Sequence, residues 1–336
     1  MFGPTPGTHL IFATLLAVAL VFDFLNGFHD AANVVATMIA SRALSPRAAL
    51  LLAAGANLVG PLLFGLAVAN TVGKEVVDPS GVTITVVLAA LLAASSWNLV
   101  TWWWGIPSSS SHALAGGLVG GAAAFGGWSI IRVAGLTKVA LALFVSPLLG
   151  FVVAWLVLRF ILGAARGATP RINKHFNRLQ LLSATALALS HGTNDAQKTM
   201  GIITMGLVTL GYQATFHVPL WVVLASATAI GLGTAAGGWR IIRTLGGKFY
   251  RIRPIHSLTS QTAAAAVILS ASLLGGPVST THVVSSAIVG AGASERMSQV
   301  RWMNLADIGV AWLITVPITA LLGAAAYLML RPLIGA

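Results

Sequence analysis

Two aspartates lie inside long apolar stretches and are the first residues whose type and position suggest chemistry. Asp30 belongs to G-F-H-D-A-A-N, residues 27–33, and Asp195 belongs to G-T-N-D-A-Q-K, residues 192–198. A carboxylate in the middle of an apolar membrane segment is costly and usually marks a functional site. We interpret the aspartates as a pair of carboxylates that line a shared cavity. The alternative is an aspartate that is simply paired with a buried base.

The residues around both aspartates are small or carry amides, which suits an interrupted helix. In such a stretch, freed backbone carbonyls and carboxylate oxygens together coordinate a hard cation. A carboxylate at this depth can also take up a proton. The sequence therefore predicts a cation site and leaves sodium and proton both open as the coupled ion.

Two clusters of hydroxyl residues point to an anion site. The chain reads P-S-S-S-S-H at residues 107–112 and P-V-S-T-T-H at residues 277–282. Proline followed by hydroxyl residues and an apolar run predicts the start of a helix. A helix start offers unpaired N–H groups and the positive end of the dipole, which bind anions. The alternative is that these residues only cap and pack helices, but the repetition of the cluster favours an oxyanion site.

A cation site beside an anion site would make the binding of the two ions interdependent. Two carboxylates repel a phosphate or sulfate, and an intervening cation reverses the sign of that interaction. This is the chemical basis of symport.

Lys198 either contacts the anion or neutralises an aspartate, and His112 and His282 donate to the anion, carry protons or fix their loops. The sequence assigns no role to His29 and His191.

The composition requires membrane helices to position these residues. Of 336 residues, 19 are basic and 7 acidic, and this charged fraction of 8% compares with about 25% in soluble domains. The hydrophobic fraction is 57% and the mean hydropathy is +0.89, which excludes a soluble enzyme or secreted module. Basic cytoplasmic loops explain the net charge of +12. We therefore expect the lipid bilayer as a partner and no nucleic acid.

Neither an enzyme nor a cofactor is predicted. The chain has no cysteine and so no thiolate metal site, and it has no Walker-type nucleotide motif. No nucleophile and base stand out as a catalytic set. Energy would come from an ion gradient, with sodium or protons as the coupling ion.

Ten apolar segments are candidates for membrane helices. They span residues 9–41, 47–70, 82–104, 108–124, 137–162, 179–211, 217–236, 258–275, 278–293 and 302–330. The first and sixth exceed one plain span and contain the aspartate stretches, so we expect broken helices there. The fourth and ninth are short and rich in serine and threonine, which makes them candidates for re-entrant hairpin arms.

The aspartate stretch and the hydroxyl cluster each occur twice, in the same order, and each half of the chain holds five segments. An odd number places the second half upside down relative to the first, which is the inverted-topology repeat of many secondary transporters. We therefore expect an all-α polytopic membrane protein. Its parts would be a first transmembrane repeat at 1–162, a basic cytoplasmic linker at 163–178 and a second, inverted repeat at 179–336.

The distribution of basic residues predicts the orientation in the cell membrane. Arginine and lysine are enriched in cytoplasmic loops, which places 42–47, 163–178, 237–257 and 294–301 in the cytoplasm. The loops at 71–81 and 212–216 and both chain ends would then lie outside. Arg132 and Lys138, near an outer turn, do not fit this pattern.

The same stretches resemble the signatures of a known family. F-L-N-G-F-H-D-A-A-N-V-V-A-T at residues 24–37, S-H-G-T-N-D-A-Q-K-T-M-G at residues 190–201 and the two hydroxyl clusters are similar to motifs of the inorganic phosphate transporter (PiT) family. The resemblance extends over about residues 10–330 and, with the short central linker, suggests a compact prokaryotic member. It implies an inverted-repeat fold and uptake of inorganic phosphate in symport with sodium or protons.

The resemblance also implies residue roles. The coupled cation and the phosphate would be served by Asp30, Asn33, Asn194 and Asp195. Phosphate oxygens would be bound by the hydroxyls of Ser109, Ser110, Ser111, Ser279, Thr280 and Thr281. Asn57 and Gln261 stand where many members carry glutamates, so a coupling scheme based on those glutamates does not transfer.

Other functions remain open on this sequence. A sulfate or other oxyanion permease could use the same fold, and so could a passive anion channel, which would need no alternating access. A homo-oligomer is also open, because the residues do not determine the oligomeric state.

Overall fold

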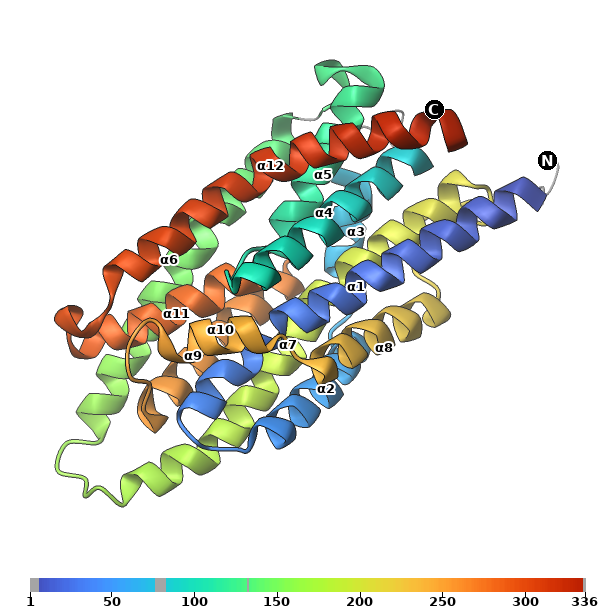
Figure 1. Cartoon of the computed structure of the whole chain (residues 1–336). Helices are drawn as coiled ribbons and strands as arrows, with labels where there is room; N and C mark the ends of the chain where they lie inside the picture. Colours follow the sequence, from blue (N-terminus) through green and yellow to red (C-terminus); the bar gives the residue numbers. More distant parts are fainter. Residues whose placement is uncertain (1–5, 76–82, 132, 335–336) are drawn as a thin grey trace.

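The protein is a bundle of long helices. The computed structural model describes residues 6–75, 83–131 and 133–334, and these contain no β-strand. Its helices are α1 (Pro6–Ala40), α2 (Pro46–Leu63), α3 (Ala67–Glu75), α4 (Ile84–Trp104), α5 (Ser110–Gly126), α6 (Val133–Ala164), α7 (Ile172–Thr209), α8 (Leu220–Ala236), α9 (Trp239–Gly247), α10 (Pro254–Leu273), α11 (Thr280–Glu295) and α12 (Trp302–Ile334). The predicted all-α class is confirmed (Figure 1).

The helices α1–α6 correspond in order and type to α7–α12. Each half completes the packing of the other, because α1 lies against α8 and α7 against α2, while α5 lies against α12 and α11 against α6. This exchange of partners is what an inverted repeat requires. The exact division at 1–162, 163–178 and 179–336 stays a prediction, and α7 begins inside the stretch expected as linker.

The helix breaks lie at different places from those expected. We predicted interruptions at the two aspartates, but α1 and α7 run unbroken through both. The second segment is broken instead, into α2 and α3, and the seventh segment, α8, is followed after a bend of 69° by the short helix α9. The stretch 237–257, expected as a loop, therefore contains α9.

The glycines near the aspartates serve close helix approach and do not unwind the chain. A Cβ atom on Gly27 would lie 2.2 Å from the Ile230 carbonyl oxygen of α8, and one on Gly192 would lie 2.4 Å from the Asn57 carbonyl oxygen of α2. The two contacts are equivalent, because α1 corresponds to α7 and α8 corresponds to α2. The expectation of freed carbonyls at these positions was therefore wrong, because the glycines are used to bring backbones together.

Five helices of the described part of the chain are long and apolar enough to cross a membrane, or six if the bent pair α8 and α9 is one span. This is fewer than the ten predicted segments. The difference arises because α5 and α11 are short and because α7 and α10 carry many buried polar residues. Large apolar side chains such as Phe160 and Leu321 are more than 70% exposed, as expected for a surface in contact with lipid.

The fourth and ninth segments begin inside the protein, in agreement with hairpin arms. α4 and α5 are joined by a short turn at Gly105, and α10 and α11 by a corresponding turn at Gly275. Both glycines have positive φ, 66° and 73°, which favours glycine. The chain thus reverses in the interior, and α5 and α11 start there with Ser109 and Ser279 fully buried.

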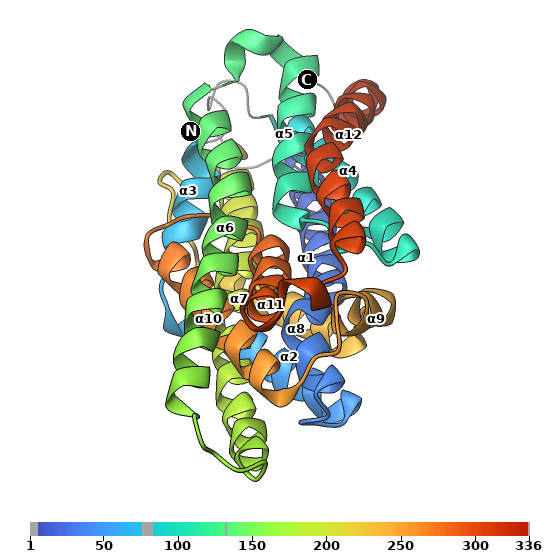
Figure 2. The ribbon, with the colours of Figure 1, turned by 90° about the vertical axis from the view of Figure 1, so that its left-hand side faces the viewer.

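The predicted cytoplasmic loops gather at one end of the bundle, and the start of α1 and the end of α12 lie at the other end (Figures 1 and 2). Three of these loops border one cavity of about 500 Å³, to which they contribute Arg42, Arg251, Arg253 and Arg301. This clustering agrees with the predicted alternation of the segments. The side of the membrane that each end faces stays a prediction, and the expected outer loop at 71–81 and Arg132 lie partly or wholly outside the described residues.

Close contacts between the halves predict sensitive positions. A Cβ atom on Gly120 of α5 would lie 1.8 Å from the Ala320 carbonyl oxygen of α12, and one on Gly290 of α11 would lie 2.3 Å from that of Phe151 in α6. Gly120→Ala and Gly290→Ala should each destabilise the protein by about 1–3 kcal/mol through overpacking. Thermal unfolding in detergent measures this.

Gly55→Ala is the matched control, because a Cβ atom there meets nothing within 4 Å. It should leave stability unchanged or raise it by up to about 1 kcal/mol, since alanine is the better helix former. Equal effects at all three positions would contradict the assigned packing.

Candidate functional site

The starts of α5 and α11 meet in the centre of the protein. Ser109 and Ser279 are their N-caps, and their side chains accept hydrogen bonds of 3.2 Å from the backbone N–H groups of His112 and His282. The rings of His112 and His282 stack with centroids 5.0 Å apart. Two helix N-termini, with their N–H groups and positive dipole ends, are thus brought side by side, as the hydroxyl clusters predicted.

The two aspartates face each other across α1 and α7, next to the start of α11. The Thr280 hydroxyl lies 3.0 Å from Asp195 Oδ2 and 3.3 Å from Asp30 Oδ2. Because a hydroxyl has one proton, it can donate to only one of the two carboxylates at a time. The Thr281 hydroxyl donates to Asp30 Oδ2 at 3.1 Å. The predicted pair of carboxylates is thus brought together, and both residues are buried.

Corresponding residues of the two halves make corresponding bonds. Asn33 of α1 donates to the Thr281 hydroxyl of α11 at 3.0 Å. At the equivalent place in the other half, Lys198 of α7 donates to the Ser111 hydroxyl of α5 at 2.5 Å. Lys198 also pairs with Asp195 Oδ1 at 2.5 Å. It therefore neutralises an aspartate, one of the two roles that the sequence left open, and it also reaches the hydroxyl cluster. Its contact with an anion stays a prediction.

Two predicted site residues lie apart from the carboxylate pair. Ser110 donates to Asn26 on α1 at 2.7 Å. Asn194 is turned toward the hairpin between α10 and α11, where it donates to Ser272 at 2.8 Å and to the Gly276 carbonyl at 3.2 Å. In this conformation Asn194 does not face the aspartates, because its side chain lies on the neighbouring face of α7, toward the end of α10.

Two histidines, to which the motifs assigned no role, complete the site. His29 Nδ1 lies 2.6 Å from Asp30 Oδ1, and His191 Nε2 lies 3.1 Å from Asp195 Oδ2 and 3.9 Å from Asp30 Oδ2. Their spacing was the available signal, since His29 adjoins one aspartate and His191 precedes the other by one helical turn.

The amide Asn57 holds His191 in place. Its Oδ1 lies 3.2 Å from His191 Nδ1, and its Nδ2 donates to Thr234 at 2.8 Å. An amide at this position bonds the histidine without adding a third carboxylate to the cluster. Asn57 thus belongs to the shell around the site, which sequence comparison of the two motifs alone does not show.

Asp30, His191 and Asp195 form a group that can hold a cation. One ligand atom from each lies within 4.8 Å of the others. Carboxylate oxygens suit hard cations such as sodium, and the imidazole can serve as a ligand or a donor. A cavity of about 40 Å³ borders Ser111, His112 and Lys198, which is room for little more than a water molecule. The site is therefore compact in this conformation.

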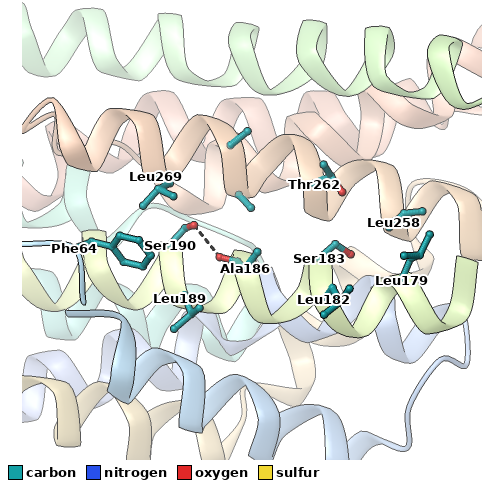
Figure 3. Close-up of a pocket in the computed structure, with 12 residues that line it drawn as sticks. Phe64, Leu179, Leu182, Ser183, Ala186, Leu189, Ser190, Leu258, Thr262 and Leu269 are labelled. Atoms are coloured by element: carbon teal, nitrogen blue, oxygen red, sulfur yellow. Dashed lines mark hydrogen bonds between the residues drawn. The ribbon is translucent and has the colours of Figure 1, made fainter. Parts of the chain in front are cut away.

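A much larger space, a groove of about 490 Å³ between α7 and α10, is not this site (Figure 3). Its lining is mainly leucine and alanine, and Leu182 is 71% exposed. Ser190 in its wall is satisfied by the Ala186 carbonyl at 2.8 Å. The groove offers an apolar surface suited to lipid chains and no charged group for an ion.

Comparison with known proteins identifies the family. The model of the phosphate transporter family matches residues 26–169 and 162–323. The chain belongs to the phosphate transporter family. This confirms the resemblance seen in the motifs. It also agrees with the prediction that the protein is a transporter and not an enzyme.

Relatives and a solved structure agree with this assignment. A probable low-affinity inorganic phosphate transporter of Bacillus subtilis (strain 168) is 46% identical, covering 96% of this chain and 98% of that protein. A protein of the same description from Rhizobium meliloti (strain 1021) is 49% identical over 93% of this chain and 94% of that protein. The solved structure of a sodium-dependent phosphate transporter superposes with a TM-score of 0.89 at 24% identity, covering 96% of this chain and all of that one. It shows that the fold is shared.

The buried ion pair predicts a strong effect of one substitution. Lys198→Gln leaves Asp195 without its cation and should destabilise the protein by about 3–5 kcal/mol. Asp195→Asn in the same chain should restore much of that loss, because the uncompensated charge is removed. Thermal unfolding of both variants in detergent measures these differences.

The exposed pair of Arg253 with Glu295 is the control. The Arg253 side chain is 52% exposed, so Arg253→Gln should change stability by about 0–1 kcal/mol. If Lys198→Gln proved as mild as Arg253→Gln, Asp195 would not depend on Lys198.

Proposed function

We propose that the protein imports inorganic phosphate by symport with a monovalent cation, sodium or proton, through alternating access around the central site. The observation that carries the proposal is the meeting of two hydroxyl-lined helix starts with a pair of buried carboxylates. Anion donors and cation ligands are thereby built into one place. The names of the family and of its close relatives support phosphate as the substrate.

The donors of α5 and α11 suit the oxygens of an oxyanion. The first-turn N–H groups offer hydrogen bonds without a full positive charge, and the hydroxyls of Ser110, Ser111, Thr280 and Thr281 can do so by turning from their present acceptors. Lys198 adds a full positive charge. Ser109 and Ser279, assigned to phosphate by resemblance, hold the helix starts in place by capping them.

The carboxylates favour phosphate over sulfate. Near neutral pH, phosphate retains a hydroxyl group that can donate a hydrogen bond to a carboxylate, whereas sulfate only accepts hydrogen bonds. Asp30 or Asp195 can accept from that hydroxyl while a cation offsets their charge. A sulfate permease on the same fold remains the alternative, and the transport assay separates the two.

Coupling follows from the electrostatics of the pair. Without a cation, two buried carboxylates oppose the entry of an anion, and the low dielectric of the interior strengthens this repulsion. A cation held by Asp30, Asp195 and His191, with amide oxygens from Asn33 or Asn194 drawn in, removes it. Phosphate binding then depends on cation binding, and a passive channel has no need of this arrangement.

Uptake of labelled phosphate into proteoliposomes tests the function. With sodium and proton gradients imposed separately, at least one of them should drive accumulation above the outside concentration. Excess unlabelled phosphate should inhibit more strongly than sulfate. Accumulation under neither gradient would rule out symport, and transport of sulfate in place of phosphate would rule out the substrate.

Asp30→Asn and Asp195→Asn should each abolish coupled uptake, because each removes one cation ligand charge. Both variants keep the side-chain shape and should still appear as folded protein in the membrane. Uptake by the purified variants, with their amount checked by gel filtration, measures this. Wild-type rates in both would show that the carboxylates do not form the coupling site.

Thr281→Val tests the anion site, because valine keeps the volume and removes the hydroxyl. A hydrogen bond to a charged group contributes about 1.5–3 kcal/mol, so the half-saturating phosphate concentration should rise by roughly tenfold or more. Thr185→Val on the outside of α7, where the hydroxyl bonds only the Leu181 carbonyl, is the control and should match the wild type. An unchanged half-saturating concentration in Thr281→Val would exclude this hydroxyl from phosphate binding.

A further inference from the structure

A third aspartate, Asp23, is buried in α1 two helical turns before Asp30. Residues seven apart lie on the same face of a helix, so Asp23 faces α7 as Asp30 does. The residue is completely buried, and neither carboxylate oxygen has a hydrogen-bond partner within the described part of the chain. It is unlike Asp30 and Asp195, each of which has a histidine and a threonine hydroxyl within reach.

The surroundings of Asp23 contain hydroxyls but no base that pairs with it. Thr199 of α7 lies near Asp23 as a potential donor, but in this conformation neither its hydroxyl nor the Asp23 oxygens have a hydrogen-bond partner within the described part of the chain. Ser226 of α8 lies at the same level, because α8 runs parallel to α1 with Ile230 against Gly27. The Ser226 hydroxyl is also buried without a described partner.

Few charged groups influence this position. Asp195 and Lys198 of α7 both act on Asp23, with opposite signs. The other two helices around it, α4 and α8, carry no ionisable side chain. The remaining helices in contact with α1 carry ionisable residues that do not act on Asp23, namely Arg47, Arg240, Arg243, His256, His282 and Glu295.

An ionised carboxylate in such a place would be very costly, because among the described residues it has no ion-pair partner and no donor at hydrogen-bond distance. Lys198 cannot supply the charge, since it is already bonded to Asp195 and Ser111. A sodium ion would need several ligands, and Asp23 does not belong to the described group of side chains that can hold a metal ion, which is Asp30, His191 and Asp195. The neutral, protonated carboxyl is the form that the surroundings accept.

We propose that Asp23 is the proton-coupling residue of the transporter, protonated in this conformation and deprotonated when the α1–α7 interface opens to water. The proposal rests on the proposed symport of phosphate and names the group that carries the proton. Proton and phosphate are linked through Lys198 and Asp195. When a cation or phosphate enters the central site and draws Lys198 toward itself, the field at Asp23 changes, and the proton affinity of Asp23 changes with it.

The packing around Asp23 prevents a proton leak in this conformation. Toward the N-terminal end of α1, Leu15 lies against Gly206, where an added Cβ atom would come within 2.2 Å of it. Leu15, Phe22, Met200 and Ile203 are all buried around this contact. The carboxyl therefore exchanges its proton only when the two helices separate, which is the condition that strict coupling requires.

Proteoliposomes containing the full chain test the proposal. In the absence of sodium, a gradient of one pH unit supports roughly tenfold accumulation for each coupled proton. Asp23→Asn mimics the protonated carboxyl permanently, so it should lose this accumulation. It should still exchange internal for external labelled phosphate at equal pH. Asp307→Asn removes a carboxylate that is exposed on α12, and this control should accumulate phosphate as the wild type does.

Each other result has a defined meaning. Wild-type accumulation by Asp23→Asn under the pH gradient would overturn the proposal, and so would a wild type driven by sodium alone. A wild type that takes up no phosphate under any gradient would instead defeat the proposed function. Loss of exchange as well as accumulation in Asp23→Asn would assign Asp23 a structural role.

Infrared spectroscopy gives a readout that does not depend on transport. The wild type at neutral pH should show a protonated-carboxyl band that is missing from Asp23→Asn. Asp23→Glu serves if the asparagine variant does not fold, because its band should shift in frequency. A wild-type spectrum without such a band would show that Asp23 is ionised and would overturn the proposal.

Discussion

The rest of the structure depends on the close approach of two carboxylates in a dry interior. Asp30 and Asp195 share the hydroxyl of Thr280, which can donate to only one of them. Such a pair is stable only with compensating charge and donors. Lys198, His29, His191 and two helix N-termini provide them. In the proposed symport, a cation and an anion would enter this arrangement together, each offsetting the charge of the other.

The inverted repeat is what brings these groups together. α1 packs closely on α8, and α7 on α2, because Gly27 and Gly192 leave room for the partner backbones. α5 and α11 start in the interior because the turns at Gly105 and Gly275 reverse the chain there. Each half supplies one carboxylate and one hydroxyl-lined helix start, and neither half could form the site alone.

The sequence was sufficient to predict the architecture and most of the central residues. Charge scarcity made Asp30 and Asp195 conspicuous, and the repeated motifs predicted both the inverted topology and the meeting of the hydroxyl clusters. The places of the helix breaks could not be predicted, because glycine serves equally for unwinding and for close packing. Only the contact of Gly27 with Ile230 decides between them.

Other features depended on three-dimensional contacts in a similar way. Asn194 and Asn33 are both asparagines close to an aspartate, so the sequence treats them alike. Asn194 nevertheless bonds Ser272 at the end of α10, because its side chain points away from Asp195. Asp23 has no counterpart in the second half, so repetition did not reveal it. Its isolation from donors becomes visible only when α4, α7 and α8 surround it.

The two halves share a fold but not a charge distribution, and this difference can give transport a direction of coupling. Lys198 occupies the place that Asn33 occupies in the first half, so one hydroxyl cluster is bonded by a cation and the other by a neutral amide. Each aspartate has a histidine, but His29 approaches Asp30 from the adjacent residue and His191 approaches Asp195 from the preceding turn. In a symmetrical site, exchanging the conformations of the two halves would leave the ions in equivalent surroundings. Under the proposed alternating access, the exchange would move them between a cationic and a neutral partner, so the two openings would present the ions with different fields and could differ in affinity.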